Sequence, residues 1–198
     1  MKLFLNEASP YARLIRVLLV ETGLENESEL ITVDPWNASE ELLEVNPASR
    51  IPALALDNGT HLVESSCIAD YLIHISGEAR MSPMCYADAP QRLEILGLGR
   101  AATDSAFGSV IQRRFGADSP LTERWLGALP RVAERLDILY ARRQLTTDCD
   151  QADLTVAVAF EYIDFRLPEI NWRSAAPNLS EHVVSLAGRT SMVTTRPT

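Results

Sequence analysis

The chain has 198 residues, which is enough for one large domain or two small ones. Its hydrophobic content of 46% and charged content of 23% are ordinary for a globular protein, and no apolar run approaches the ~20 residues that cross a bilayer. The net charge of −9 disfavours nucleic acid and anionic membranes as partners.

The acidic charge is concentrated in the first part of the chain. Residues 1–77 hold four basic and twelve acidic side chains, so Arg13, Arg16 and Arg50 are among the few cations there. The three cysteines form no CxxC pair and no ligand cluster with the three histidines, so we expect neither a disulfide framework nor a metal site. Because the first residues lack the features of a secretion signal, we expect a cytoplasmic protein.

The first 77 residues alternate strand and helix signals. A strand is predicted at 2–5, followed by a helix at 10–22 that Ser9 caps and Gly23 ends. Further predicted elements are strands at 29–33, 53–56 and 61–63 and helices at 39–45 and 65–76. Asn58-Gly59 predicts a hairpin turn with positive φ at both residues. The order β-α-β-α-β-β-α implies a mixed sheet of four strands.

The pattern breaks at 79–88, and we expect a linker there between a first domain at 1–78 and a second at 89–198. The second domain is predicted to be an all-α helical bundle, with helices at about 89–115, 119–143, 151–167 and 178–188. Segment 154–167 is apolar on nearly every face, which is typical of a helix buried inside a bundle. Asp150 is placed to cap that helix.

Pro52 lies at the start of a predicted strand, where proline is tolerated because that position donates no ladder hydrogen bond. One interpretation is a strand start with an ordinary trans bond, which is the commoner isomer. The other is a cis Ile51–Pro52 bond that turns the backbone N–H and C=O of Ile51 outward. An extended peptide ligand can pair with such groups like an added strand.

Glu64-Ser65 precedes a predicted helix and also has two interpretations. Ser65 can simply cap the helix, with Glu64 as a solvated neighbour. Alternatively, the free N–H groups and the hydroxyl at a helix start bind a carboxylate, while Glu64 pairs with an ammonium. A carboxylate and an ammonium on one carbon form the head of an α-amino acid, so the second interpretation predicts a ligand with such an end.

Ser9 is either a plain helix cap or a hydrogen-bond donor at the reactive end of a ligand. A free thiol has a pKa of about 8.5 and is only a few per cent thiolate at neutral pH. A hydroxyl donor beside a helix N-terminus favours the thiolate. No histidine and aspartate are arranged to activate Ser9 as a nucleophile.

In this order and spacing, the three segments resemble the glutathione transferase family. That family has a catalytic Ser, Tyr or Cys after its first strand, here Ser9. An Asn-Pro-x-x-x-[Val/Ile]-Pro-x-Leu segment follows, here 46–54, and then Glu/Asp-Ser before an Ile-Ala-x-Tyr-Leu helix, here 64–72. The resemblance extends over the whole chain, since residues 162–179 are similar to the second domain of bacterial members.

The resemblance implies a thioredoxin-like first domain, an all-helical second domain and a homodimer. It also implies that glutathione is the co-substrate and that no metal is needed. Ile51, before a cis Pro52, would bind the cysteinyl part of glutathione through its main chain. Glu64 and Ser65 would hold the γ-glutamyl head, and Ser9 would lie at the sulfur.

The remaining implied site residues are less closely tied to the motifs. Asp104 matches an acidic residue that in several classes reaches the partner subunit's glutathione amine, although a solvated helix charge is the alternative. Arg50 is expected to contact a ligand carboxylate or to face water. Four residues that follow Asp104 have two interpretations. They either line an apolar pocket for the electrophile or belong to the helix core: Phe107, Val110, Ile111 and Arg114.

The sequence therefore predicts a cytoplasmic, detoxifying glutathione transferase that stabilises the glutathione thiolate and adds it to an apolar electrophile. Two alternatives stay open. One is glutathione-dependent reduction or dehalogenation, although Ser9 disfavours the mixed-disulfide route that a cysteine there permits. The other is a non-catalytic, transferase-like module that binds a protein partner.

Overall fold

The structure is a computed structural model that describes residues 1–116, 119–143 and 149–197. It divides into two compact units. Unit 1 comprises Met1–Ser82 together with Thr190–Thr198, and unit 2 comprises Pro83–Arg189. The C-terminal segment thus groups with unit 1, which differs from the expected domain at 89–198, because it packs along the first helix instead of extending the bundle.

Unit 1 is built on a mixed four-stranded sheet in the order β2-β1-β3-β4. β1 pairs in parallel with β2 and antiparallel with β3, which in turn pairs antiparallel with β4. The strands are β1 (Lys2–Leu5), β2 (Glu29–Thr32), β3 (Ala53–Ala55) and β4 (His61–Val63). The sheet lies in a thioredoxin-like arrangement of strands and helices, as predicted.

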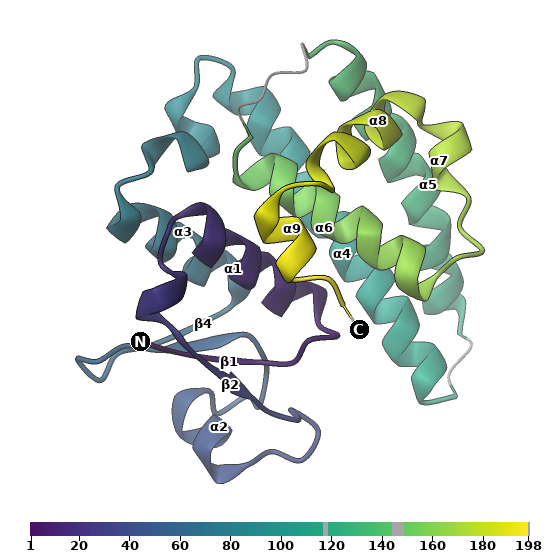
Figure 1. Cartoon of the computed structure of the whole chain (residues 1–198). Coiled ribbons are helices and arrows are strands. Elements are labelled where there is room, and N and C mark those ends of the chain that lie inside the picture. Colours follow the sequence, from purple (N-terminus) through teal and green to yellow (C-terminus); the bar gives the residue numbers. More distant parts are fainter. Residues whose placement is uncertain (117–118, 144–148, 198) are drawn as a thin grey trace. The chain divides into compact units, whose positions relative to one another are not determined.

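Helices cover both faces of this sheet. Figure 1 shows α1 and α3 on one face and α2 on the other. Leu42 and Val45 of α2 pack on Phe4 and Ala53 of the sheet, forming a small buried core. The helices of unit 1 are α1 (Pro10–Glu21), α2 (Glu40–Val45), α3 (Ser65–Ser76) and α9 (Thr190–Thr194), with 3-10 turns η1 (Glu25–Glu27) and η2 (Ala79–Met81).

The hairpin between β3 and β4 differs from the prediction. Gly59 has a positive φ of 82°, but Asn58 does not have a positive φ. The Gly59 N–H donates to the Leu56 carbonyl, and the Leu56 N–H donates to the Thr60 carbonyl. This pattern is typical of a three-residue hairpin loop that ends in a glycine bulge, so only the glycine needs the left-handed conformation. The Asn58 side chain instead accepts a hydrogen bond from the Thr60 N–H.

Unit 2 is helical within its described residues. Helix α6 is its centre, since twelve of its sixteen residues are buried, and it packs against α4. At Gly99 of α4 an added Cβ would lie 3.2 Å from the backbone nitrogen of Val156, so the absence of a side chain permits this close approach. The elements are η3 (Pro83–Cys85), α4 (Ala89–Arg114), α5 (Pro120–Ala141), α6 (Gln151–Arg166), α7 (Trp172–Ala175) and α8 (Pro177–Leu186).

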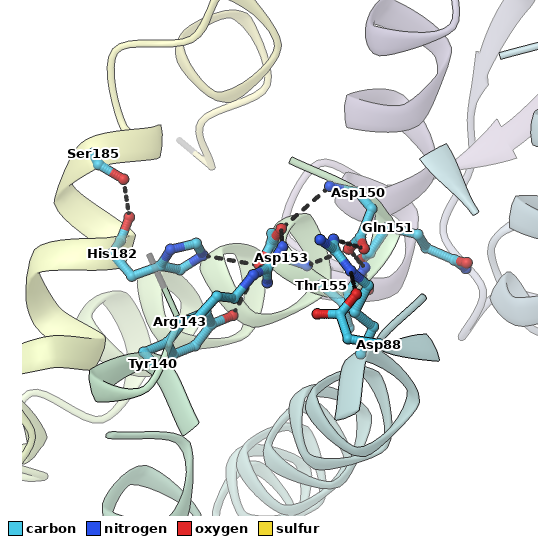
Figure 2. A network of polar contacts seen from close by, with 11 residues as sticks. Asp88, Tyr140, Arg143, Asp150, Gln151, Asp153, Thr155, His182 and Ser185 are labelled. Atoms are coloured by element: carbon cyan, nitrogen blue, oxygen red, sulfur yellow. Dashed lines mark hydrogen bonds and ion pairs between the residues drawn. The ribbon is translucent and has the colours of Figure 1, made fainter. Parts of the chain in front are cut away.

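A buried polar network begins where α6 begins (Figure 2). The Asp150 carboxylate accepts hydrogen bonds from the N–H groups of Ala152 and Asp153, and the Asp153 carboxylate accepts one from the Asp150 N–H. The two residues thus form a reciprocal capping box. Arg92 of α4 donates to Asp150 at 2.6 Å, so the same carboxylate caps one helix and pairs with another.

On the other side of the network, Asp153 contacts Arg143, Tyr140 and His182 (Figure 2). Burial, followed by the positive charge of Arg143, lowers the pKa of His182 to about 4, and Asp150 opposes that shift. The 3.4 Å approach of His182 Nε2 to Asp153 would favour the imidazolium, but Arg143 already pairs with that carboxylate through two hydrogen bonds. His182 is therefore neutral at pH 7 and stacks on the Tyr140 ring.

The described residues include no helix long and apolar enough to span a bilayer.

Candidate glutathione site

The strand registers bring three predicted segments to one end of the sheet. Phe4 of β1 pairs with Ala53 of β3, and Ala53 pairs with Val63 of β4. The loop that follows β1, the loop that precedes β3 and the residues that follow β4 therefore lie at the same end. These loops carry Ser9, Ile51-Pro52 and Glu64-Ser65, so the fold gathers the predicted site residues of unit 1 although they are far apart in sequence.

Two helices start at this end of the sheet, α1 after Ser9 and α3 after Glu64. Each helix start presents backbone N–H groups without intrahelical partners and the positive end of a helix dipole. Both features favour an anion, such as a carboxylate or a thiolate. The site therefore has two helix starts that favour an anion, although they lie in the most acidic part of the chain, residues 1–77.

Ser9 caps α1 as the sequence predicts. It has an extended backbone (φ −81°, ψ 123°), and Pro10 occupies the first helical turn. Its Oγ accepts a hydrogen bond from the Ala12 N–H at 3.3 Å, and the residue is 8% exposed. Because a hydroxyl both accepts and donates, the capping bond leaves the hydroxyl proton for a further acceptor. Capping and donation to a ligand are thus compatible roles.

The Ile51–Pro52 peptide bond is cis. Ile51 is half-buried and Pro52 is buried. Within the described part of the chain, no hydrogen bond outside the helices and strands uses the backbone N–H or C=O of Ile51. Both groups remain for an extended ligand, which is the pairing that the second interpretation of Pro52 requires.

Side chains from the preceding segment brace this loop. The buried Asn46 side chain donates to the Arg50 carbonyl at 2.8 Å and accepts from the Ala48 N–H at 3.0 Å. Ser49, at a φ of 52°, donates to the Pro35 carbonyl at 2.8 Å. The sequence analysis did not identify these bracing roles. The signal available was the short polar side chains around Pro47, which often bond to nearby backbone.

At the start of α3 the structure corrects the capping interpretation. Glu64, not Ser65, occupies the cap position, and no side chain caps the helix. Ser65 is the first helical residue and is half-buried. Glu64 has φ 70° and ψ 124°, an uncommon conformation for a residue with a side chain, and such conformations cluster at functional sites. The first amides of α3 thus lack a side-chain cap, which suits a bound carboxylate.

Of the other predicted site residues, Arg50 lies beside Ile51 in the loop before β3, and the rest lie on α4 in unit 2. Arg50 is exposed and precedes the cis bond. Asp104 is exposed on α4 in unit 2, as is Arg114 at the end of that helix. Phe107 and Val110 are half-buried and pack against the core of unit 2, which favours the helix-core interpretation for these two. Ile111 is half-buried on the same helix.

Among the described residues there is no group of three or more His, Cys, Asp or Glu side chains that could hold a metal ion. Within the described part of the chain, Cys67, Cys85 and Cys149 form no disulfide bond. The groups that the site does offer are a hydroxyl, main-chain hydrogen-bonding groups and two helix starts.

Comparisons with known proteins identify the family to which this chain is similar. The family described as "Glutathione S-transferase, N-terminal domain" matches residues 8–75. The Escherichia coli (strain K12) protein described as "Uncharacterized GST-like protein YibF" is 27% identical over 201 residues, which cover 100% of this chain and 98% of that protein.

Solved structures of similar proteins extend the agreement to the full length. A glutathione S-transferase from Methylobacillus flagellatus KT, with glutathione bound, is 27% identical with a TM-score of 0.87 and covers 100% of this chain and 99% of that chain. A glutathione transferase family member from Pseudomonas fluorescens Pf-5, with bound glutathione, is 32% identical with a TM-score of 0.85, covering 100% of this chain and 98% of that chain. The same protein was also solved with S-(propanoic acid)-glutathione. From its sequence and its structure, this chain belongs to the glutathione transferase family.

Proposed function

We propose that the chain binds glutathione at the end of the sheet defined above and transfers it to an apolar electrophile. The observation that supports this most strongly is the gathering of the Ser9, Ile51-Pro52 and Glu64-Ser65 segments through the strand registers. Glutathione is a peptide with an α-amino acid head at one end and a thiol in its middle. An uncapped helix start, an open main-chain segment and a hydroxyl suit those three parts in turn.

Each part of the ligand has a proposed partner. The γ-glutamyl carboxylate binds the first amides of α3 and the Ser65 hydroxyl, while the exposed Glu64 pairs with the ammonium. The cysteinyl main chain pairs with Ile51 like an added strand. The sulfur would lie beside Ser9, and the exposed Arg50 would contact the glycyl carboxylate.

The catalytic task of Ser9 is to stabilise the thiolate. A donated hydrogen bond and the α1 dipole both favour the anion over the thiol. Lowering the thiol pKa by about 2 units corresponds to about 2.7 kcal/mol of preferential thiolate stabilisation. The thiol proton leaves to solvent, and the sulfur lone pair then attacks the electrophilic carbon. With an aryl chloride, a C–S bond forms and chloride departs with the electrons of the C–Cl bond.

Three further features belong to the same proposal. A homodimer would bring Asp104 of one subunit to the ammonium of glutathione in the other. The side chains of α4 that do not pack in the helix core would line the pocket for the electrophile; the candidates are Phe107, Val110, Ile111 and Arg114. Cysteines without disulfide bonds among the described residues suit a reducing compartment such as the cytoplasm.

The test combines binding with turnover. Glutathione is titrated into the protein by calorimetry, and conjugation of an activated aryl chloride is followed with wild type and Ser9→Ala. We expect binding by both proteins and a fall in kcat of about 10²-fold for Ser9→Ala, the scale of one lost transition-state donor. Absence of binding at millimolar glutathione would overturn the proposal. Binding without turnover of several electrophiles would favour the non-catalytic module instead.

A further inference from the structure

The C-terminal segment 190–195 makes an unexpected set of bonds to α1. Figure 1 shows α9 lying beside α1. The Arg13 guanidinium donates to the Met192 carbonyl at 3.2 Å, and Arg16 donates to the Thr194 carbonyl at 3.4 Å. At the far end of α1, the Ser191 hydroxyl donates to the Glu21 carboxylate at 2.5 Å. The segment is thus attached along the length of α1.

These bonds satisfy groups that the short helix α9 cannot satisfy itself. The last carbonyls of a helix have no intrahelical donor, and α9 has only five residues. Arginine side chains that donate to such carbonyls stabilise a helix C-terminus. The attachment is also well buried, since Arg13 is 2% exposed, Ser191 1% and Met192 0%.

Arg13 connects this segment directly to the proposed catalytic serine. Its backbone N–H donates to the Ser9 carbonyl at 2.9 Å, which is the first hydrogen bond of α1. The same residue therefore fixes Ser9 through its backbone and is itself fixed by Met192 through its side chain. Movement of α1 relative to the segment would carry Ser9 with it.

We propose that Arg13, held by the C-terminal segment 190–195, is a positioning residue for Ser9. This inference rests on the proposed function of Ser9. The segment affects thiolate formation and kcat. It leaves the affinity for glutathione nearly unchanged, because the proposed γ-glutamyl and cysteinyl contacts come from the loop before β3 and from the start of α3. A position error of about 1 Å in a reacting group is enough to lower a rate by about 10²-fold.

The test uses the full-length protein with Arg13→Met, Arg13→Lys and the milder Ser191→Ala. The pKa of enzyme-bound glutathione is measured from thiolate absorbance against pH, alongside kcat and the Kd for glutathione. For Arg13→Met we expect a thiol pKa raised by about one unit and kcat lowered about tenfold or more, with Kd within about threefold of wild type. Arg13→Lys should restore most of kcat, because an ammonium can still donate to the Met192 carbonyl.

A matched control separates positioning from loss of stability. Val183→Ala removes buried apolar volume in unit 2, where Val183 is 1% exposed, and should lower Tm without moving the thiol pKa. If Arg13→Met and Ser191→Ala behave like Val183→Ala, with lower Tm but wild-type thiol pKa and kcat, the segment is only structural and the inference is wrong.

Two further measurements separate this inference from the proposed function. If Ser9→Ala itself leaves the thiol pKa unchanged, the proposed role of Ser9 fails. If Ser9→Ala raises that pKa and Arg13→Met does not, only the positioning role fails. Hydrogen exchange without glutathione gives an independent readout: Arg13→Met should accelerate exchange of the α1 amides near Arg13 by about tenfold. Unchanged protection of those amides would contradict the inference.

Discussion

In unit 2, Arg92 pairs with two carboxylates, one exposed and one buried. Because the cation is the same in both pairs, replacing each carboxylate in turn measures how burial changes the strength of an ion pair. Asp88 accepts from Arg92 Nε at 2.8 Å, and Asp150 accepts from Arg92 Nη1 at 2.6 Å. The Asp88 side chain is 47% exposed, whereas the Asp150 side chain is 0% exposed and that of Arg92 9%. Asparagine at either position keeps the shape and removes the charge.

The expected costs differ by several fold. Asp88→Asn removes a partly exposed pair between the cap position of α4 and its first turn, so the free energy of unfolding should fall by about 0.5 kcal/mol and by no more than about 1. Asp150→Asn keeps an oxygen that can cap α6, but it leaves a buried guanidinium without its buried partner, which costs about 3–5 kcal/mol. Since Asp88 still contacts Arg92, we expect the lower limit, about 3 kcal/mol. Asp150→Ala also loses the cap, adding about 1–2 kcal/mol.

Urea unfolding followed by far-ultraviolet circular dichroism measures these differences. The comparison is valid where the variants share the m-value of wild type, because m reports the surface exposed on unfolding. The expected order of stability is wild type, Asp88→Asn, Asp150→Asn and then Asp150→Ala. Equal losses for Asp88→Asn and Asp150→Asn would refute the reasoning, since burial would then not decide the strength of the pair.

Three other predictions follow from single contacts. Between pH 6.5 and about 4 the unfolded chain binds a proton at His182 that the folded chain does not. The free energy of unfolding should therefore be unaffected by His182 protonation above pH 6.5 and should fall by about 3 kcal/mol as the pH drops to 4. His182→Leu should remove most of this pH dependence of the free energy of unfolding. Gly108→Ala should destabilise by about 1–3 kcal/mol, because its Cβ would lie 2.8 Å from a Trp125 ring carbon. An added Cβ at Gly97 would have no atom within 4 Å, so Gly97→Ala should stabilise α4 by about 0.5–1 kcal/mol. Equal changes in Tm for Gly108→Ala and Gly97→Ala would contradict this account. Ser65→Ala should weaken glutathione binding by about 1.5–3 kcal/mol in calorimetry, with Ser66→Ala as the control that keeps wild-type affinity.

Local signals predicted most of the helix boundaries. Ser9 and Asp150 were predicted as caps, and both cap their helices through their side chains. Ser39 was predicted as the first residue of a helix, and it is the cap of α2. A cap acts within a single turn, so the sequence on either side of it is sufficient to identify it. The strands were likewise found within one or two residues, because each short apolar run is bounded by turn residues.

Other features depend on contacts that no local pattern contains. The isomer at Pro52 is decided by tertiary surroundings, since cis and trans differ by only about 1 kcal/mol in X-Pro bonds. The positive φ of Glu64 runs against the preference of that residue type, and Ser65 was available as an alternative cap. The bond from Arg13 to Met192 joins residues 179 positions apart, so the grouping of the C-terminal segment with unit 1 could not be read from periodicity.

The most direct test of the account is a crystal structure of the protein with glutathione. The account predicts the sulfur within about 3.5 Å of Ser9 Oγ, close enough to accept a hydrogen bond from the hydroxyl. The cysteinyl main chain should pair with Ile51, and the γ-glutamyl carboxylate should lie at the first amides of α3. Glutathione bound elsewhere, or bound here with its sulfur directed away from Ser9, would contradict the account.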